Sequence, residues 1–164
     1  MKQRARTLWI VATFLTATLA TQTTAQDTTL GASLGYGGHD TPTPHAHLDV
    51  TVAMDAQNLS ADLPDGGHLG IRLDVAAPFD AASYPAHGAS VVWRRPSDAF
   101  IPYAGIGADV RWFDLDGVRC YETAARLTAG VEVPVAESVA LRAEAIVLTS
   151  GRRSAAVGVT YALP

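Results

Sequence analysis

Lysine is almost absent from this sequence, and cysteine is nearly so. Lys2 is the one lysine, so arginine and histidine carry nearly all of the positive charge. This absence fits either an arginine-biased genome or a protein with little strand surface facing water, because lysine is normally a surface residue. Cys120 is the one cysteine, which excludes an internal disulfide. The net charge of -4 and the lack of a basic run argue against a nucleic-acid-binding surface.

Long apolar runs are also missing, apart from one near the N-terminus. Basic residues at positions 2–6 precede an apolar stretch from Leu8 to Leu19, and small residues follow up to Ala25. The stretch is shorter than the roughly 20 residues that a membrane-spanning helix needs. The pattern therefore predicts a secretory signal peptide that is cleaved after Ala25, with Ala20 as the alternative site.

The predicted signal peptide is residues 1–25, and residues 26–164 then form one domain by length. No later stretch is apolar enough to predict a transmembrane helix. The mature chain instead reads as short runs with a period of two, separated by clusters of Gly, Pro, Asp, Asn and Ser. The eight predicted strands are 29–37, 45–55, 67–77, 88–95, 101–113, 120–133, 138–149 and 153–163. Hairpin-length links between them predict antiparallel neighbours.

Each predicted strand has one apolar and one polar face. Tyr121 to Val131 shows this pattern: Leu127 and Ala129 share the apolar side, while Arg126 and Thr128 share the other. Alternation alone does not say which face is inside. A soluble lipocalin-type barrel places the apolar face inside, and an outer-membrane barrel places it outside.

Glycine and balanced charge on the polar face favour the second arrangement. Glycine weakens a strand unless something must approach closely, as in the crowded lumen of an eight-stranded barrel. The polar-face glycines are Gly31, Gly35, Gly70, Gly105, Gly107, Gly130 and Gly158. The charges nearly cancel, as a lumen with little water requires. We predict a lumen network of Asp49, Arg72, Asp74, Arg94, Asp109, Arg111, Glu122, Arg126, Glu132, Arg142 and Glu144.

Large aromatic residues on the apolar face fall near strand ends. With the N-terminus in the periplasm, Tyr36, Trp112 and Tyr121 come to the outer rim, and Trp93 and Tyr161 to the inner one. This distribution is typical of the interfacial girdles of membrane barrels, where one end of the ring is in hydrocarbon and the other is wet.

Together these features resemble the small eight-stranded outer-membrane barrels of Gram-negative-type bacteria, of the outer-membrane protein A type. The resemblance spans the mature chain, and its clearest pieces are Pro102 to Ala108, Ala129 to Val135, Val139 to Glu144 and the last strand. It implies an all-β, closed antiparallel barrel that contacts outer-membrane lipid. It also implies that Gly158, Tyr161 and Leu163 form a signal for the barrel-assembly machinery.

The sequence departs from the family pattern in two places. The family usually ends on an aromatic residue, whereas Leu163 takes that place here and Pro164 follows. The turn from Asp55 to Gly67 is long where the family has a short periplasmic turn. The first hairpin is therefore the part of the topology that the resemblance supports least.

Four histidines fall near the predicted outer rim: His39, His45, His47 and His87. Imidazoles suit zinc or copper, and His45 and His47 share one face of a strand. Loop histidines are usually just solvated, and spacing across loops gives no ligand geometry. We therefore predict no metal and no cofactor.

Enzyme chemistry has little support in the residues. Some barrels of this kind are lipid-modifying hydrolases that use a serine and a histidine, which must lie within hydrogen-bond reach. His68 with Ser33 is one conceivable pair, but nothing singles it out. The sequence predicts a monomeric outer-membrane barrel with a structural or surface-interaction role and at most a narrow pore. The alternative is a soluble periplasmic lipocalin-like carrier of a small ligand.

Overall fold

The computed structural model describes residues 28–38, 42–54, 67–79, 85–95, 97 and 99–164. The predicted signal peptide, His39 and most of the long turn after Asp55 lie outside these residues. Eight strands follow one another: β1 (Thr28–Gly38), β2 (Thr43–Ala53), β3 (His68–Pro78), β4 (Ala86–Arg94), β5 (Ile101–Leu115), β6 (Val118–Ala136), β7 (Val139–Leu148) and β8 (Arg153–Ala162). Among these described residues, no helix is long and apolar enough to cross a membrane.

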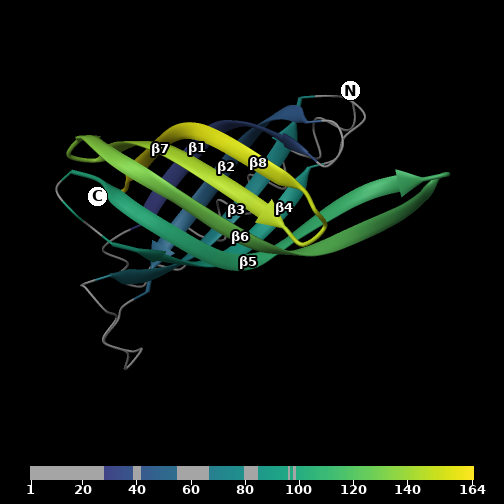
Figure 1. Cartoon of the computed structure of the whole chain (residues 1–164), viewed down its shortest axis with the longest axis horizontal. Helices are drawn as coiled ribbons and strands as arrows, with labels where there is room; N and C mark the ends of the chain where they lie inside the picture. Colours follow the sequence, from purple (N-terminus) through teal and green to yellow (C-terminus); the bar gives the residue numbers. More distant parts are fainter. Residues whose placement is uncertain (1–27, 39–41, 55–66, 80–84, 96, 98) are drawn as a thin grey trace.

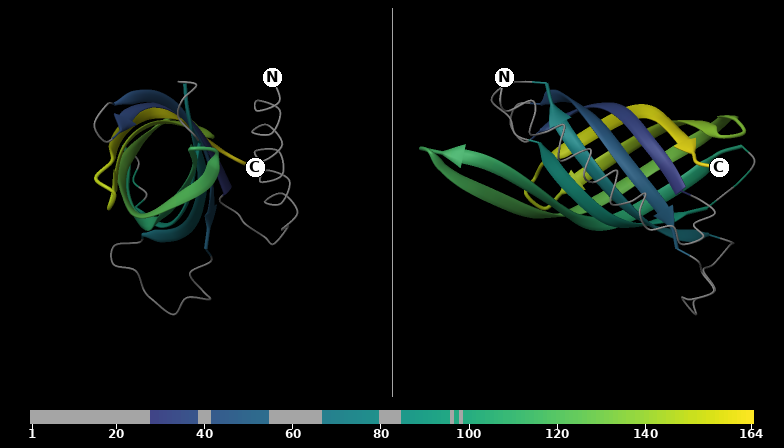
Figure 2. Two further views of the ribbon diagram at one scale, coloured as in Figure 1. Left: turned by 90° about the vertical axis from the view of Figure 1, so that its right-hand side faces the viewer. Right: turned by 180° about the vertical axis from the view of Figure 1, so that it is seen from behind.

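The strands form one closed antiparallel barrel in sequence order. Each strand pairs with the next, and β1 pairs with β8 from Thr29 opposite Ala162 to Gly38 opposite Arg153. The end-on view in Figure 2 shows the resulting ring. The eight predicted strands, their order and their antiparallel pairing are therefore confirmed.

The hairpin between β5 and β6 is longer than predicted, because the chain reverses in two residues. Leu115 pairs with Val118, and the residues between them, Asp116 and Gly117, have φ of 50° and 81°. Two successive positive φ values define the type I′ turn that Asp-Gly favours in hairpins. The predicted loop over 114–119 was wrong, because the strands run on through most of it.

The β5–β6 hairpin extends past the rest of the barrel (Figure 1). Pairing of β5 with β4 ends at Arg111, and pairing of β6 with β7 ends at Arg126. Beyond these residues the hairpin is a two-stranded ribbon that pairs with no other described strand, and its base contacts the β7–β8 hairpin through Ala125 and Glu122. Trp112 and Tyr121 are opposite each other in its register, with ring centroids 5.7 Å apart.

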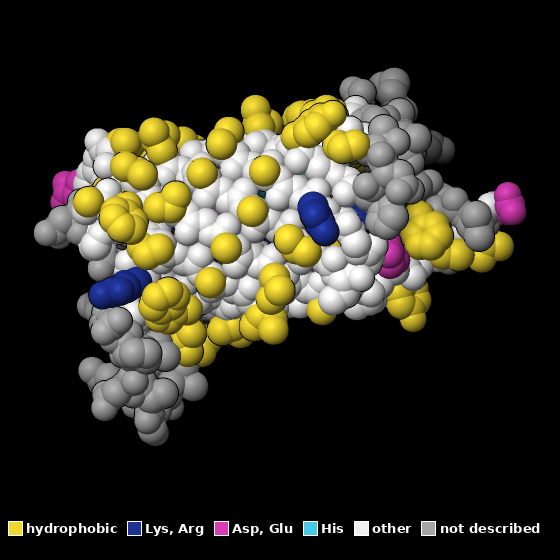
Figure 3. Space-filling view, in the orientation of Figure 1, with side chains coloured by type: hydrophobic (Ala, Val, Ile, Leu, Met, Phe, Trp, Pro, Cys, Tyr) yellow, Lys and Arg dark blue, Asp and Glu magenta, His cyan; other side chains and the backbone are white. Residues whose placement is uncertain are grey.

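The apolar face of the barrel points outward. Ile106, Leu127 and Leu141 are 65%, 59% and 51% exposed, whereas their strand neighbours Arg126 and Arg142 are buried. Successive side chains of a strand point to opposite faces, so the polar residues fill the interior. Hydrophobic side chains are spread over the visible wall between the two ends of the barrel (Figure 3). This is the reverse of the lipocalin-like alternative, which needs an apolar interior.

Fluorophore labelling tests which face meets lipid. In a Cys120→Ser background, a label on a cysteine at Leu141 or Ala125 should project into hydrocarbon, since both residues are exposed on the outer face. Quenchers attached to lipid acyl chains should then strongly reduce its emission in proteoliposomes.

A cysteine at Thr128 is the matched control, because this residue is buried and one pleat step out of phase with Leu127. Its label should be quenched much less than the labels at Leu141 and Ala125. Equal and negligible quenching at all three positions would contradict the outward apolar face.

Candidate functional site

A chain of ionic contacts crosses the barrel interior near its middle. Arg142 on β7 donates to both carboxylate oxygens of Asp49 on β2, at 2.9 and 2.5 Å. Arg72 on β3 donates to both oxygens of Glu144 on β7, at 2.5 and 2.9 Å, and also reaches Asp49 at 3.4 Å. The Tyr103 hydroxyl on β5 donates to Glu144 at 2.9 Å. Because β7 is separated from β2 and β3 by β8 and β1, these contacts span the lumen.

A second cluster lies toward the hairpin end and is centred on Arg126 of β6. The Arg126 guanidinium donates to both oxygens of Asp74 on β3 at 2.6 Å, and to Asp109 on β5 at 3.1 Å. Its Nε donates to the Thr128 hydroxyl at 3.0 Å. Arg126 is 1% exposed, so without these acceptors its charge would be stranded in a nearly dry interior. Charge-assisted contacts of this kind are among the strongest hydrogen bonds in proteins.

The remaining predicted network residues lie closer to the two ends. Arg94 on β4 forms an ion pair with Glu132 on β6, toward the chain termini. Arg111 and Glu122 face each other in the β5–β6 register, but in the described part of the chain Arg111 forms no ion pair. Glu122 instead lies 3.7 Å from Arg152, at the β7–β8 hairpin. The structure thus joins most of the predicted charges across the lumen but places Arg111 and Glu122 at its mouth.

The lumen glycines make room for these side chains. A Cβ at Gly31 would lie 2.3 Å from an oxygen of Asp49, and a Cβ at Gly88 would lie 2.3 Å from a guanidinium nitrogen of Arg126. A Cβ at Gly130 would lie 2.4 Å from the Tyr103 ring. A Cβ at these positions would therefore force the facing side chain from another strand to move.

The three rim histidines that the structure describes, His45, His47 and His87, do not form one cluster. His45 and His47 are buried inside the mouth of the barrel, with ring centroids 4.8 Å apart. His87 lies next to the lumen-facing Gly88 and points to the opposite face of β4. The described residues contain no group of three or more His, Cys, Asp or Glu that could hold a metal ion.

The predicted interface aromatics lie at the two ends of the outer wall. Tyr36 is 61% exposed, and Trp112 and Tyr121 are 45% and 68% exposed at the base of the projecting hairpin. Tyr161 is 45% exposed at the end that carries the chain termini. Trp93 is only partly exposed there, because its ring packs against Gly67.

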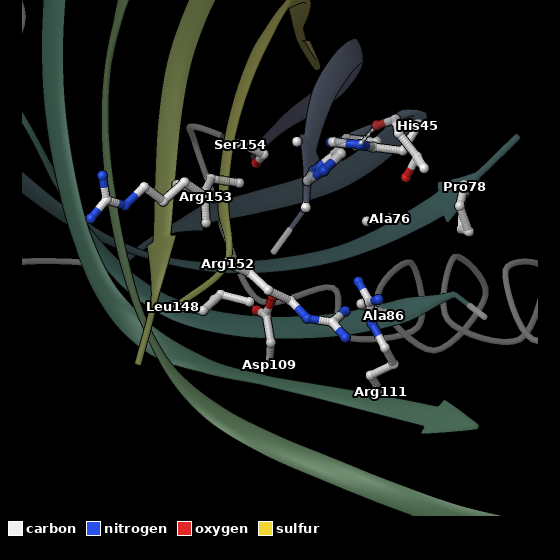
Figure 4. A pocket seen from close by; sticks show the side chains of 15 residues that line it. His45, Ala76, Pro78, Ala86, Asp109, Arg111, Leu148, Arg152, Arg153 and Ser154 are labelled. Carbon is white, nitrogen blue, oxygen red and sulfur yellow. Dashed lines mark hydrogen bonds between the residues drawn. The ribbon is translucent and has the colours of Figure 1, made fainter. Parts of the chain in front are cut away.

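A cavity of about 360 Å³ opens at the hairpin end, above the Arg126 cluster (Figure 4). His45 and His47 of β2 line one side of it, and Arg111 and Asp109 of β5 line another. Arg152 reaches it from the β7–β8 hairpin. Below this cavity, the side chains of Arg126, Asp74 and Asp109 are hydrogen-bonded to one another.

Sequence reasoning missed the neutral partners of the network. Tyr103, Thr128 and Ser33 each bond a charged side chain inside the barrel: Ser33 accepts from Arg142 at 3.4 Å. Their placement on the polar face was visible in the alternation. Their hydrogen bonds could not be predicted. Those of Tyr103 and Ser33 cross the lumen and join residues that are far apart in the chain.

No family model and no curated protein sequence matches the chain. Solved structures do match its fold. A de novo designed transmembrane β-barrel matches with a TM-score of 0.61 at 14% identity, covering 86% of this chain and 98% of that one. The N-terminal β-barrel domain of Pseudomonas aeruginosa OprF matches with a TM-score of 0.60 at 12% identity, covering 82% and 97%. The outer-membrane enzyme PagL matches with a TM-score of 0.50 at 16% identity, covering 83% and 99%.

The chain therefore has the fold of a small eight-stranded outer-membrane β-barrel. The fold does not decide the function, because these neighbours include a designed protein and an enzyme.

Breaking the central ion pairs should destabilise the barrel. Arg72→Met leaves Glu144 and Asp49 with fewer donors in a dry interior, so we expect the free energy of unfolding to fall by about 3–5 kcal/mol. Urea titration in lipid vesicles, followed by tryptophan fluorescence, measures the change.

The matched control is Arg153→Met, since Arg153 is exposed at the start of β8; it should change stability by less than about 0.5 kcal/mol. The double variant Arg72→Met/Glu144→Met should lose less than the sum of the two single losses, because it removes both charges. A loss for Arg72→Met no larger than that for Arg153→Met would contradict a structural role for the pair.

Proposed function

We propose that this chain is a small outer-membrane protein that crosses the membrane as a monomeric barrel with a plugged lumen, in a structural or surface-interaction role. One observation carries this proposal: ion pairs join opposite walls of the barrel, while the apolar side chains face outward. In a closed sheet each strand bonds its backbone groups to a neighbour on both sides, and here the outer wall is apolar. A membrane span requires both properties.

The route to the membrane is part of the proposal. Residues 1–25 act as a cleaved signal peptide, and the last strand, with Gly158, Tyr161 and Leu163, is the element that the barrel-assembly machinery recognises. The geometry of that strand supports this role. β8 closes the barrel against β1, and the Leu163 amide extends the ladder by donating to the Thr28 carbonyl at 2.8 Å.

The aromatic side chains fit a barrel that spans the membrane with the start of β1 in the periplasm. Tyr36, Trp112 and Tyr121 would lie at the outer membrane–water interface, and Trp93 and Tyr161 at the periplasmic one. The chain termini are then periplasmic, and the projecting β5–β6 hairpin faces the outside of the cell.

We propose a role without catalysis. PagL is an enzyme with this fold, so only this chain's own side chains can indicate whether it catalyses a reaction. Ser33 is the cross-strand partner of His47, but its hydroxyl accepts from Arg142 inside the filled lumen. A serine nucleophile instead needs a base within hydrogen-bond reach and a substrate beside it.

Fractionation tests the location. The mature protein should sediment with outer membranes, require detergent for extraction and begin after residue 25, as N-terminal mass spectrometry would show. Recovery in the soluble osmotic-shock fraction would be incompatible with the proposal.

Planar-bilayer recording tests the plugged lumen. The wild-type barrel should show little or no steady conductance, because guanidinium–carboxylate contacts occupy its middle. The variant Arg72→Ser/Glu144→Ser shortens two bonded side chains and should raise the conductance. Large, long-lived openings in the wild type would show that the charges line a water path.

A further inference from the structure

The cavity at the hairpin end differs from the lumen below it in the balance of its charges. Deeper in the barrel, Arg72, Arg126 and Arg142 each bond at least one carboxylate at 2.9 Å or less. At the mouth, Arg111 has no ion pair with a described residue, and the contact of Arg152 with Glu122 is a loose 3.7 Å. Asp109 also lines the cavity, but it is the acceptor of Arg126 at 3.1 Å. Glu122 lines the recess between Arg111 and Arg152, so at the mouth one carboxylate faces two guanidinium groups and positive charge is in excess.

The two arginines at the mouth come together. Both Arg111 and Arg152 line the cavity and the small recess beside it, and in Figure 4 their guanidinium groups converge next to Ala86. Arg153 also lines the cavity, but in the same view its side chain extends away from these two guanidinium groups. The two like charges repel each other, and the single carboxylate of Glu122 offsets this repulsion only in part, so an added anion would be stabilised between them.

Polar atoms without partners surround this pair. Ser150 Oγ, in the recess with Arg111 and Arg152, is buried and has no hydrogen-bond partner among the described residues. His45 Nδ1 lies 3.2 Å from the Thr43 carbonyl, and its Nε2 is buried without a described partner. Buried polar atoms are usually bonded, so unbonded ones beside a cavity indicate room for a ligand.

We propose that this mouth binds a phosphate-type oxyanion between Arg111 and Arg152, with Ser150 as a further donor. Guanidinium groups match the geometry of phosphate oxygens and bond them in pairs. A cavity of about 360 Å³ is large enough for such a group. The oxyanion is either free phosphate or the phosphate of an outer-leaflet headgroup. The second source rests on the proposed outer-membrane orientation, and the first does not.

Titration of the purified barrel in a neutral, phosphate-free detergent tests the site itself. Inorganic phosphate should bind saturably and shift the arginine Nε–Hε resonances. Arg111→Gln and Arg152→Gln should each weaken binding by about tenfold, as loss of one charge-assisted contact implies. Arg95→Gln is the matched control, since Arg95 is exposed at the opposite end of the barrel, and it should leave the affinity unchanged. The gel mobility of unheated samples checks that each variant is folded.

A lipid arm distinguishes the two sources of the oxyanion. In nanodiscs of phosphatidylcholine, adding a lipid with a phosphomonoester headgroup should shift the same arginine resonances if a headgroup is the ligand. If only the inorganic phosphate titration is saturable and sensitive to Arg111→Gln, the ligand is a free anion. Both results support the site, and only the headgroup source depends on the proposed outer-membrane orientation.

Two results would overturn the proposal. The first is no saturable phosphate binding and no lipid-dependent shift. The second is equal weakening by Arg95→Gln, Arg111→Gln and Arg152→Gln, because that would show diffuse attraction to the net charge of the barrel.

Discussion

The bidentate contacts between buried guanidinium and carboxylate groups are the constraint on which this structure depends. An eight-stranded barrel encloses a space just wide enough for side chains to fill, and alternation requires the filling to be polar once the wall is apolar. Charges in that space cannot be solvated by bulk water, so each must find a partner from another strand. Arg72, Arg126 and Arg142 do so by reaching across to strands that are not their neighbours.

The middle of the lumen and its hairpin end differ in how their charges are bonded. In the middle, glycines such as Gly31 and Gly88 leave room for the ends of charged side chains from other strands. At the hairpin end a cavity remains beside Arg111 and Arg152. The proposed plugged lumen with a surface role requires this combination of a bonded middle and an open mouth.

The sequence carries the architecture more fully than the contacts. A period of two, interrupted by turn residues, places eight strands and assigns each side chain to a face, and the structure agrees. The Asp116-Gly117 signal could have extended β5 and β6, since two positive φ values favour that dipeptide. Which acid each arginine meets could not be read, because Arg142 and Asp49 are brought together by barrel closure alone. Arg111 and Glu122 at the mouth show that a shared face is not enough to predict a contact. They are opposite each other in the register but do not form an ion pair with each other.

The reach of the ion pairs has a consequence for how the chain enters a bilayer. Arg72 meets Glu144 and Arg142 meets Asp49 only after β8 has joined β1, since their strands lie on different sides of that seam. A half-assembled sheet would present these charges to hydrocarbon, where each is costly. Closure of β8 against β1 during insertion, and not after it, would keep the polar lining away from the acyl chains.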